Sequence, residues 1–80
     1  MTDLQINALL YDGARVEMDG VVINSWFDDF TGEKNIELVW SYPLREVGFT
    51  AKGMTPSDLR RRLEMEIRSW VMVMNEKSEW

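Results

Sequence analysis

Apolar and polar side chains alternate through much of residues 15–51, and residues that favour turns divide this stretch into segments. Asp19-Gly20 is a strong two-residue hairpin signal. A turn there brings apolar residues together on one face, in the pairs Val16–Ile23 and Met18–Val21. A slip of one residue would move every side chain of a strand to the opposite face, so the apolar pattern constrains the register strongly. The pattern predicts an antiparallel meander with one buried face.

Two further turns extend this meander. Residues 28–35 form a loop rich in turn residues, and Pro43-Leu44 is the centre of a tight turn. The loop predicts the cross-strand pairs Phe27–Ile36, Ser25–Leu38, Ile23–Trp40 and Val21–Tyr42. The tight turn predicts the pairs Trp40–Val47, Leu38–Phe49 and Ile36–Ala51. All three turns therefore place the same set of apolar side chains on one face.

The number of strands depends on two ambiguous segments. A bulge at Asp19-Gly20 inside one long strand would shift the alternation as a turn does, so four or five strands fit. Residues 4–11 alternate as in a strand, through Leu4, Ile6, Ala8 and Leu10. The capping-box pattern Thr2-x-x-Gln5, with Gly13 as a C-cap, fits a short helix instead. We favour the strand.

The apolar period becomes helical after Thr55. This residue is a candidate N-cap, Pro56 suits the first helical position, and Asp58 complements the helix dipole. The predicted helix covers residues 56–75, with an apolar stripe for the sheet formed by Leu59, Leu63, Ile67, Trp70, Val71 and Met74. We therefore expect one α+β domain, a four- to five-stranded antiparallel meander with one C-terminal helix packed on one face. Its parts are the sheet (1–54), the helix with its cap (55–76) and a tail (77–80).

Composition removes several function classes. The 80 residues include no cysteine and no histidine, which excludes disulfides, thiolate or imidazole metal ligands and Ser-His-Asp triads. The carboxylates lie mainly in predicted turns, where no deep pocket would raise their pKa for acid–base catalysis. We therefore expect a protein that is not an enzyme and needs no cofactor. No apolar run is long enough for a membrane span, the first residues lack the pattern of a signal peptide, and we expect a cytoplasmic protein.

The acidic loop 28–33 is a candidate cation site. Its spacing fails the pattern of a calcium loop, because Phe30 occupies a ligand position. Thr-Gly after a short acidic stretch is ordinary hairpin-loop chemistry. We interpret the loop as a turn and expect no metal site.

Arg60-Arg61-Arg62 is the only basic run. Glu64 and Glu66 each lie four residues after one of these arginines, within pairing distance on a helix. The net charge of −5 also repels phosphate. A solvated helix face is the favoured interpretation, and a nucleic-acid-binding accessory protein that uses this face is the alternative.

Two groups of apolar residues remain outside the predicted core. Val22 and Trp26 lie near Val39 on the second face of the sheet, while Met65 and Met72 lie on the back of the helix, near Val73. Contiguous exposed apolar patches usually mark interaction sites, where tryptophan and methionine are favoured. We therefore predict a small non-enzymatic protein-interaction or regulatory module that binds another protein and forms a homodimer. The candidate interaction residues are Val22, Trp26, Val39, Met65, Met72 and Arg61.

Overall fold

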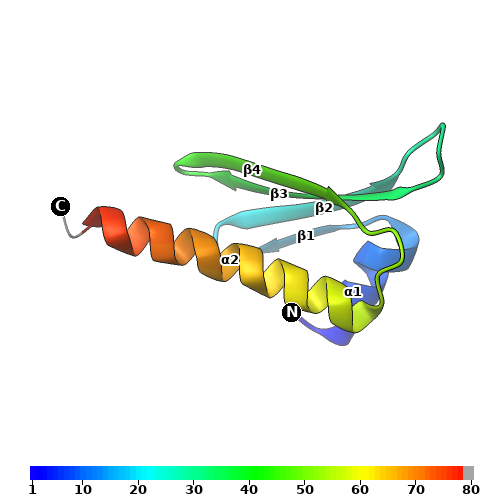
Figure 1. The fold of residues 1–80 in the computed structure, drawn as a ribbon, viewed down its shortest axis with the longest axis horizontal. Helices are drawn as coiled ribbons and strands as arrows, with labels where there is room; N and C mark the ends of the chain where they lie inside the picture. Colours follow the sequence, from blue (N-terminus) through cyan, green and yellow to red (C-terminus); the bar gives the residue numbers. More distant parts are fainter. Residues whose placement is uncertain (79–80) are drawn as a thin grey trace.

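The computed structural model describes the backbone of residues 1–78 and the side chains of residues 1–75. A short helix α1 (Asp3–Asn7) continues into the π-helical turn η1 (Ala8–Asp12). Four antiparallel strands follow in the spatial order β1-β2-β3-β4, namely β1 (Arg15–Met18), β2 (Val21–Phe27), β3 (Lys34–Ser41) and β4 (Leu44–Thr50). The long helix α2 (Pro56–Ser78) lies across one face of this sheet (Figure 1). The predicted α+β meander with a C-terminal helix is confirmed, with four strands.

The first hairpin has the predicted register. Val16 pairs with Ile23 and Met18 with Val21 across a turn at Asp19-Gly20, whose residues have φ angles of 47° and 81°. Positive φ at both central positions is typical of the two-residue turn that suits a right-handed strand twist. Asp19-Gly20 is therefore a turn and not a bulge.

The other two registers differ from the predicted ones by two residues. The observed pairs include Val21–Trp40, Ile23–Leu38 and Ser25–Ile36 between β2 and β3, and Ile36–Phe49, Leu38–Val47 and Trp40–Arg45 between β3 and β4. The predicted loop was too long, because Lys34 and Asn35 belong to β3, and the predicted tight turn was one residue too late, because Tyr42-Pro43 connects the strands. A shift of two residues preserves the face of each side chain, so the predicted buried face is still correct.

The favoured strand over residues 4–10 is wrong, because this segment is helical. Thr2 and Gln5 form the capping box, with the Gln5 backbone N donating to Thr2 Oγ1 at 3.1 Å and the Thr2 backbone N donating to Gln5 Oε1 at 2.9 Å. The side chains that reach the core are Ile6, Leu9 and Leu10, whereas Leu4 is 80% exposed. The spacing i, i+3, i+4 thus outweighs the alternation that suggested a strand.

The core lies between the sheet and the helices. Its side chains come from α1 and η1, from the inner face of all four strands and from the first half of α2, where Leu59 and Leu63 are fully buried. Ile67 and Trp70 pack against this core, but Val71 and Met74 are 51% and 38% exposed. The prediction that the whole apolar stripe of α2 lies on the sheet is therefore wrong.

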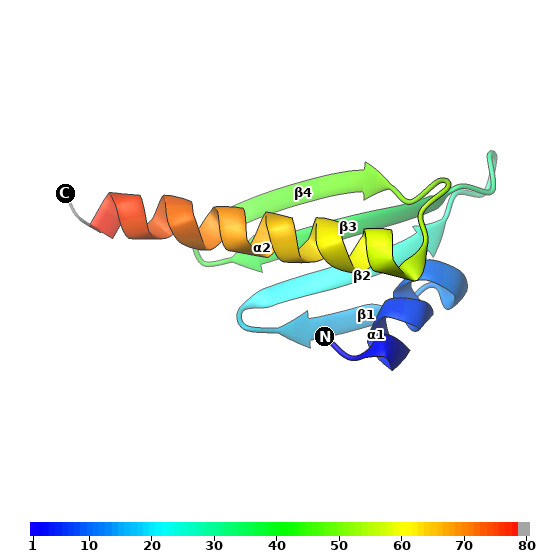
Figure 2. The same ribbon diagram turned by 60° about the horizontal axis from the view of Figure 1, so that its bottom comes forward.

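The lengths of the elements explain this exposure. The 23 residues of α2 span about 35 Å, whereas the eight residues of β3 span about 26 Å. Figure 2 shows the C-terminal part of α2 extending beyond the end of the sheet. The last turns of the helix therefore have no sheet beneath them.

Candidate interaction surfaces

The six candidate interaction residues lie on two opposite surfaces of the two-layer domain. Val22, Trp26 and Val39 belong to the face of the sheet that points away from α2, which we call the outer sheet face. Met65, Met72 and Arg61 belong to the side of α2 that points away from the sheet, which we call the outer helix face. Figure 1 shows the sheet and α2 as two layers, so these surfaces face in opposite directions.

Two valines form the centre of the outer sheet face. Val22 pairs directly with Val39, and both are half-buried. Glu17 of β1 pairs with Val22, and Glu46 of β4 pairs with Val39. One row across the sheet therefore reads Glu17, Val22, Val39, Glu46, with apolar side chains in the middle and carboxylates at both ends.

The outer sheet face also carries an exposed tryptophan and an excess of acid. Trp26 lies on the same face as Val22, four residues further along β2, and is 44% exposed. Arg15 forms an ion pair with Glu17 at 2.6 Å. Glu37 and Glu46 have no ion-pair partner among the described side chains. With three carboxylates against one guanidinium, this face has a formal net charge of −2.

The outer helix face combines methionines with arginines. Met65 and Met72 are each 57% exposed and lie about 180–200° around the helix axis from the buried Leu63. Together with Arg61 they line a furrow of about 500 Å³. All of the residues that line it come from α2, so the furrow is a groove between side chains of one helix and is open to solvent. It is a contact surface in shape, not a cavity that would enclose a small molecule.

The same helix has an apolar end, residues 70–74, in which five consecutive side chains are apolar. Consecutive residues of a helix point in directions about 100° apart, so this segment is apolar all round. Among its members only Trp70 packs against the core, whereas Val71, Met72 and Met74 are exposed. Helices that are apolar on every side are normally buried, so the apolar end lacks a covering partner within the described residues.

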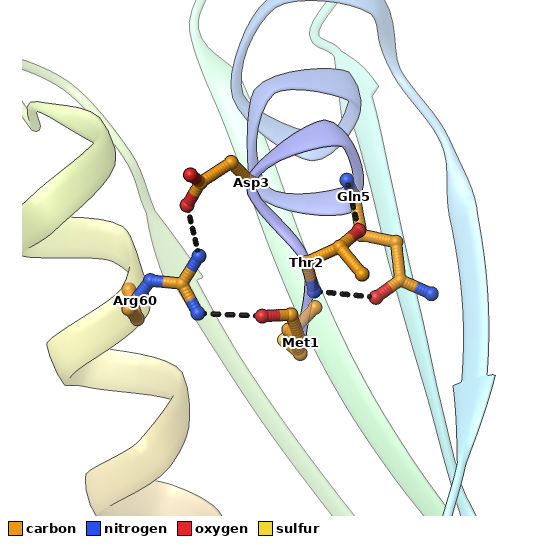
Figure 3. A network of polar contacts seen from close by, with 5 residues as sticks. All are labelled: Met1, Thr2, Asp3, Gln5 and Arg60. Carbon is orange, nitrogen blue, oxygen red and sulfur yellow. Dashed lines mark hydrogen bonds and ion pairs between the residues drawn. The ribbon is translucent and has the colours of Figure 1, made fainter.

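The arginine run does not present three guanidinium groups to one ligand. Arg60 donates to the Met1 carbonyl oxygen and to Asp3 Oδ1, each at 2.6 Å, and so ties the N-terminal segment to α2 (Figure 3). Arg62 forms the predicted pair with Glu66, at 3.0 Å, and places its guanidinium 4.4 Å from the centre of the Phe49 ring. The expected pairing of Arg60 with Glu64 is wrong, since Arg60 reaches Asp3 instead.

Arg61 is the exposed member of the run, and its charge attracts the Asp58 carboxylate. It is exposed, and within the described side chains it has neither a hydrogen-bond acceptor nor an ion-pair partner. Three adjacent helical residues point in three directions. Only Arg61 therefore contributes its charge to the outer helix face.

In the acidic loop, backbone N–H groups of the loop itself donate hydrogen bonds to a carboxylate. Asp28 Oδ1 accepts hydrogen bonds from the backbone N of Phe30 at 2.8 Å and of Thr31 at 2.9 Å. These two donors, that of Thr31 first, hold the pKa of Asp28 below its ordinary value. Among the described residues, no group of three or more acidic side chains is arranged to hold a metal ion.

One buried charge was missed by the sequence patterns. Lys34 is 7% exposed, and its Nζ has no hydrogen-bond partner in the described part of the chain. The ammonium lies 3.3 Å from the centre of the Phe27 ring. Desolvation lowers the pKa of Lys34, and the charge of Asp12 opposes this effect. Lysine is typical of loops and solvent-exposed positions, so its type gave no signal of burial.

Comparison of this chain with family models, with curated proteins and with solved structures gives no match. No helix within residues 1–78 combines the length and apolarity that a membrane span requires.

Proposed function

We propose that this protein is a small non-enzymatic interaction module that acts by binding protein surfaces and associates with further copies of itself. The observation that carries this proposal is the apolar end of α2, which extends beyond the sheet and exposes Val71, Met72 and Met74. Contiguous apolar surface of this kind is a feature of contact sites. Methionine also adapts its shape to a partner, because its side chain is unbranched and polarizable.

The length of α2 supports a binding role over a purely structural one. A helix that ended at Trp70 would already provide every described α2 side chain that packs against the core. The residues after Trp70 add exposed apolar surface to a domain of 80 residues, in which such surface carries a risk of aggregation. A partner that covers this segment would remove its exposed apolar side chains from water. The nucleic-acid alternative is less favoured, because Arg60 and Arg62 have partners within the chain.

Measurement of molar mass by light scattering over a concentration series tests the proposal. The wild type should exceed the monomer mass in the high micromolar range, and Met72→Glu should shift the curve toward the monomer. Phe30→Glu is the matched control, because Phe30 is 98% exposed at a loop distant in sequence from α2 and should leave the curve unchanged. Circular dichroism checks that each variant is folded.

Two results would overturn this proposal. One is a wild type that stays monomeric at every concentration. The other is a folded Met72→Glu variant that associates as strongly as the wild type.

A further inference from the structure

We propose that copies of this chain associate head to tail, with the outer helix face of one copy seated on the outer sheet face of the next. This inference rests on the proposed self-association and specifies its geometry. The two surfaces lie on opposite sides of the domain, so each copy offers one of each (Figure 1).

Charge complementarity is the first argument for this pairing. Among the residues that line the furrow of the outer helix face, Arg61 and Arg68 stand against Glu64, which gives the furrow a formal net charge of +1, and Asp58 lies one turn before Arg61. The outer sheet face has a net charge of −2, with Glu37 and Glu46 unpaired among the described side chains. Two outer sheet faces would repel each other, whereas the arginines that line the furrow attract the unpaired carboxylates of an outer sheet face. Complementary potentials favour the correct partner mainly by excluding wrong ones.

Matching apolar spacing is the second argument. Met65 and Met72 are seven residues apart on a helix, which separates them by about 10 Å along its axis. On the outer sheet face the Val22–Val39 pair and Trp26 are four residues apart on a strand, or about 13 Å. The flexible methionine side chains can span the remaining difference of about 3 Å. A helix lying along β2 and β3 can therefore place one methionine on the valines and the other near the tryptophan.

The layer arrangement is the third argument. The sheet has α2 on its inner face only, and the central valines of the outer face are just half-buried. A helix from another copy would cover these valines and turn the sheet into the middle layer of three, a common protein architecture. The same contact would cover the exposed methionines of that helix.

Opposite placement of the surfaces also determines how assembly proceeds. A rigid copy that uses its outer helix face on a neighbour leaves its own outer sheet face open. Contacts between different surfaces produce a ring if the rotation closes and a filament if it does not. The wild type should therefore grow beyond a dimer, which revises the homodimer expected from the sequence.

Mixing of two blocked variants tests this geometry. The helix-blocked variant carries Arg61→Glu and Met72→Glu, and the sheet-blocked variant carries Trp26→Ala and Glu46→Arg. All four positions are exposed, so both variants should fold, which circular dichroism verifies. Each variant alone should be monomeric. An equimolar mixture should give a complex with the mass of two copies, because each variant retains the surface that the other has lost.

The possible results separate the geometry from self-association itself. A monomeric wild type rejects both. A wild type that associates while the mixture stays monomeric rejects head-to-tail pairing alone. A sheet-blocked variant that associates by itself like the wild type indicates pairing of two outer helix faces, and a helix-blocked variant that does so indicates pairing of two sheet faces. Both of these results overturn the proposed geometry.

Discussion

Trp70 of α2 lies against Trp40 of β3, with ring centroids 6.1 Å apart and ring planes inclined by 50°. Arg45, the partner of Trp40 on β4, places its guanidinium 4.6 Å from the centre of the Trp70 ring and 5.6 Å from that of Trp40. The next residue of the helix, Val71, is already 51% exposed. Trp70 therefore marks the point where the part of α2 that is packed on the sheet ends and its exposed apolar part begins.

This boundary leads to the first prediction, that Trp70→Ala destabilises the fold far more than Val71→Ala. The change at Trp70 removes half-buried aromatic surface, a tilted ring pair and a contact with Arg45, with an expected cost of about 2 kcal/mol. The control change at Val71 removes exposed surface and should cost less than about 0.5 kcal/mol. Urea denaturation of dilute samples, followed by circular dichroism, measures both. Equal effects would show that the helix is not anchored at Trp70.

The sequence was most informative where a turn type determines the register by itself. Asp19-Gly20 allows one register for β1 and β2, and the structure has it. The six-residue loop before β3 imposes no such constraint, and Lys34 looked like part of it because a charged residue is rarely buried in a strand. The error of two residues preserved the buried face, so the fold class was correct although two of three registers were not.

The remaining errors concern tertiary contacts that local patterns do not contain. Helical spacing correctly indicated the pairing of Arg62 with Glu66. The same spacing wrongly favoured Glu64 for Arg60, because Asp3 approaches only after the N-terminal segment folds as a helix against α2. The candidate interaction residues were placed on the correct faces by alternation and helical spacing. Only the packed domain shows which charged side chains near these residues form ion pairs.

Arg60 is the subject of the second prediction, because it joins α2 to the N-terminal segment. Arg60→Met keeps much of the aliphatic stem but removes the donors to the Met1 carbonyl and to Asp3. We expect a loss of about 1 kcal/mol. Because the lost bonds hold only the N-terminal segment, backbone hydrogen exchange should become faster in residues 3–12 than in β3.

Two control variants separate this tether from a general charge effect. Arg61→Met removes an exposed arginine that makes no hydrogen bond or ion pair among the described side chains, and it should leave the exchange rates of residues 3–12 unchanged in dilute solution. Asp3→Ala removes an ion-pair partner whose side chain is 95% exposed, so it should have a smaller effect than Arg60→Met. A uniform increase in exchange across the domain for Arg60→Met would contradict the tether.

The start of α2 provides the third prediction, a dependence of stability on pH. The Asp58 carboxylate accepts a hydrogen bond from the Thr55 backbone N at 3.0 Å, and the Asp58 backbone N donates to Thr55 Oγ1 at 3.2 Å. The hydrogen bond from the Thr55 backbone first, then the Thr55 side chain and the charge of Arg61, lower the pKa of Asp58 in the folded state. The stability gained is present above the pKa of the unfolded chain, about 4, and is lost as the pH falls through the folded value.

A comparison of Asp58→Ala with the wild type should reveal that loss. The variant should be less stable at neutral pH, and the difference should shrink as the pH falls below about 4, because the wild-type carboxylate becomes protonated. Asp29→Ala is the matched control, since Asp29 is exposed and makes no hydrogen bond within the described residues. Urea denaturation at a series of pH values measures the effect. A difference that stays constant from pH 7 to strongly acidic conditions would contradict the capping role.

Lys34 gives the fourth prediction, in which the removal of a charge stabilises the protein. Its ammonium is buried without a hydrogen-bond partner among the described residues, an arrangement that costs about 1–3 kcal/mol, and its contact with the Phe27 ring returns about 0.5–2 kcal/mol. Lys34→Met keeps most of the volume, so we expect a net gain of up to about 1 kcal/mol at neutral pH.

Because desolvation lowers the pKa of Lys34 when the chain folds, the unfolded state binds more protons. The stability of the wild type should therefore rise as the pH approaches the ordinary lysine value of about 10, and the advantage of the variant should diminish. Lys52→Met is the control, because the Lys52 side chain is 79% exposed, and it should change neither quantity. Denaturation at pH 7 and pH 10 measures both variants, and a Lys34→Met protein that is less stable than the wild type at pH 7 would mean that the contact with Phe27 outweighs the cost of burial.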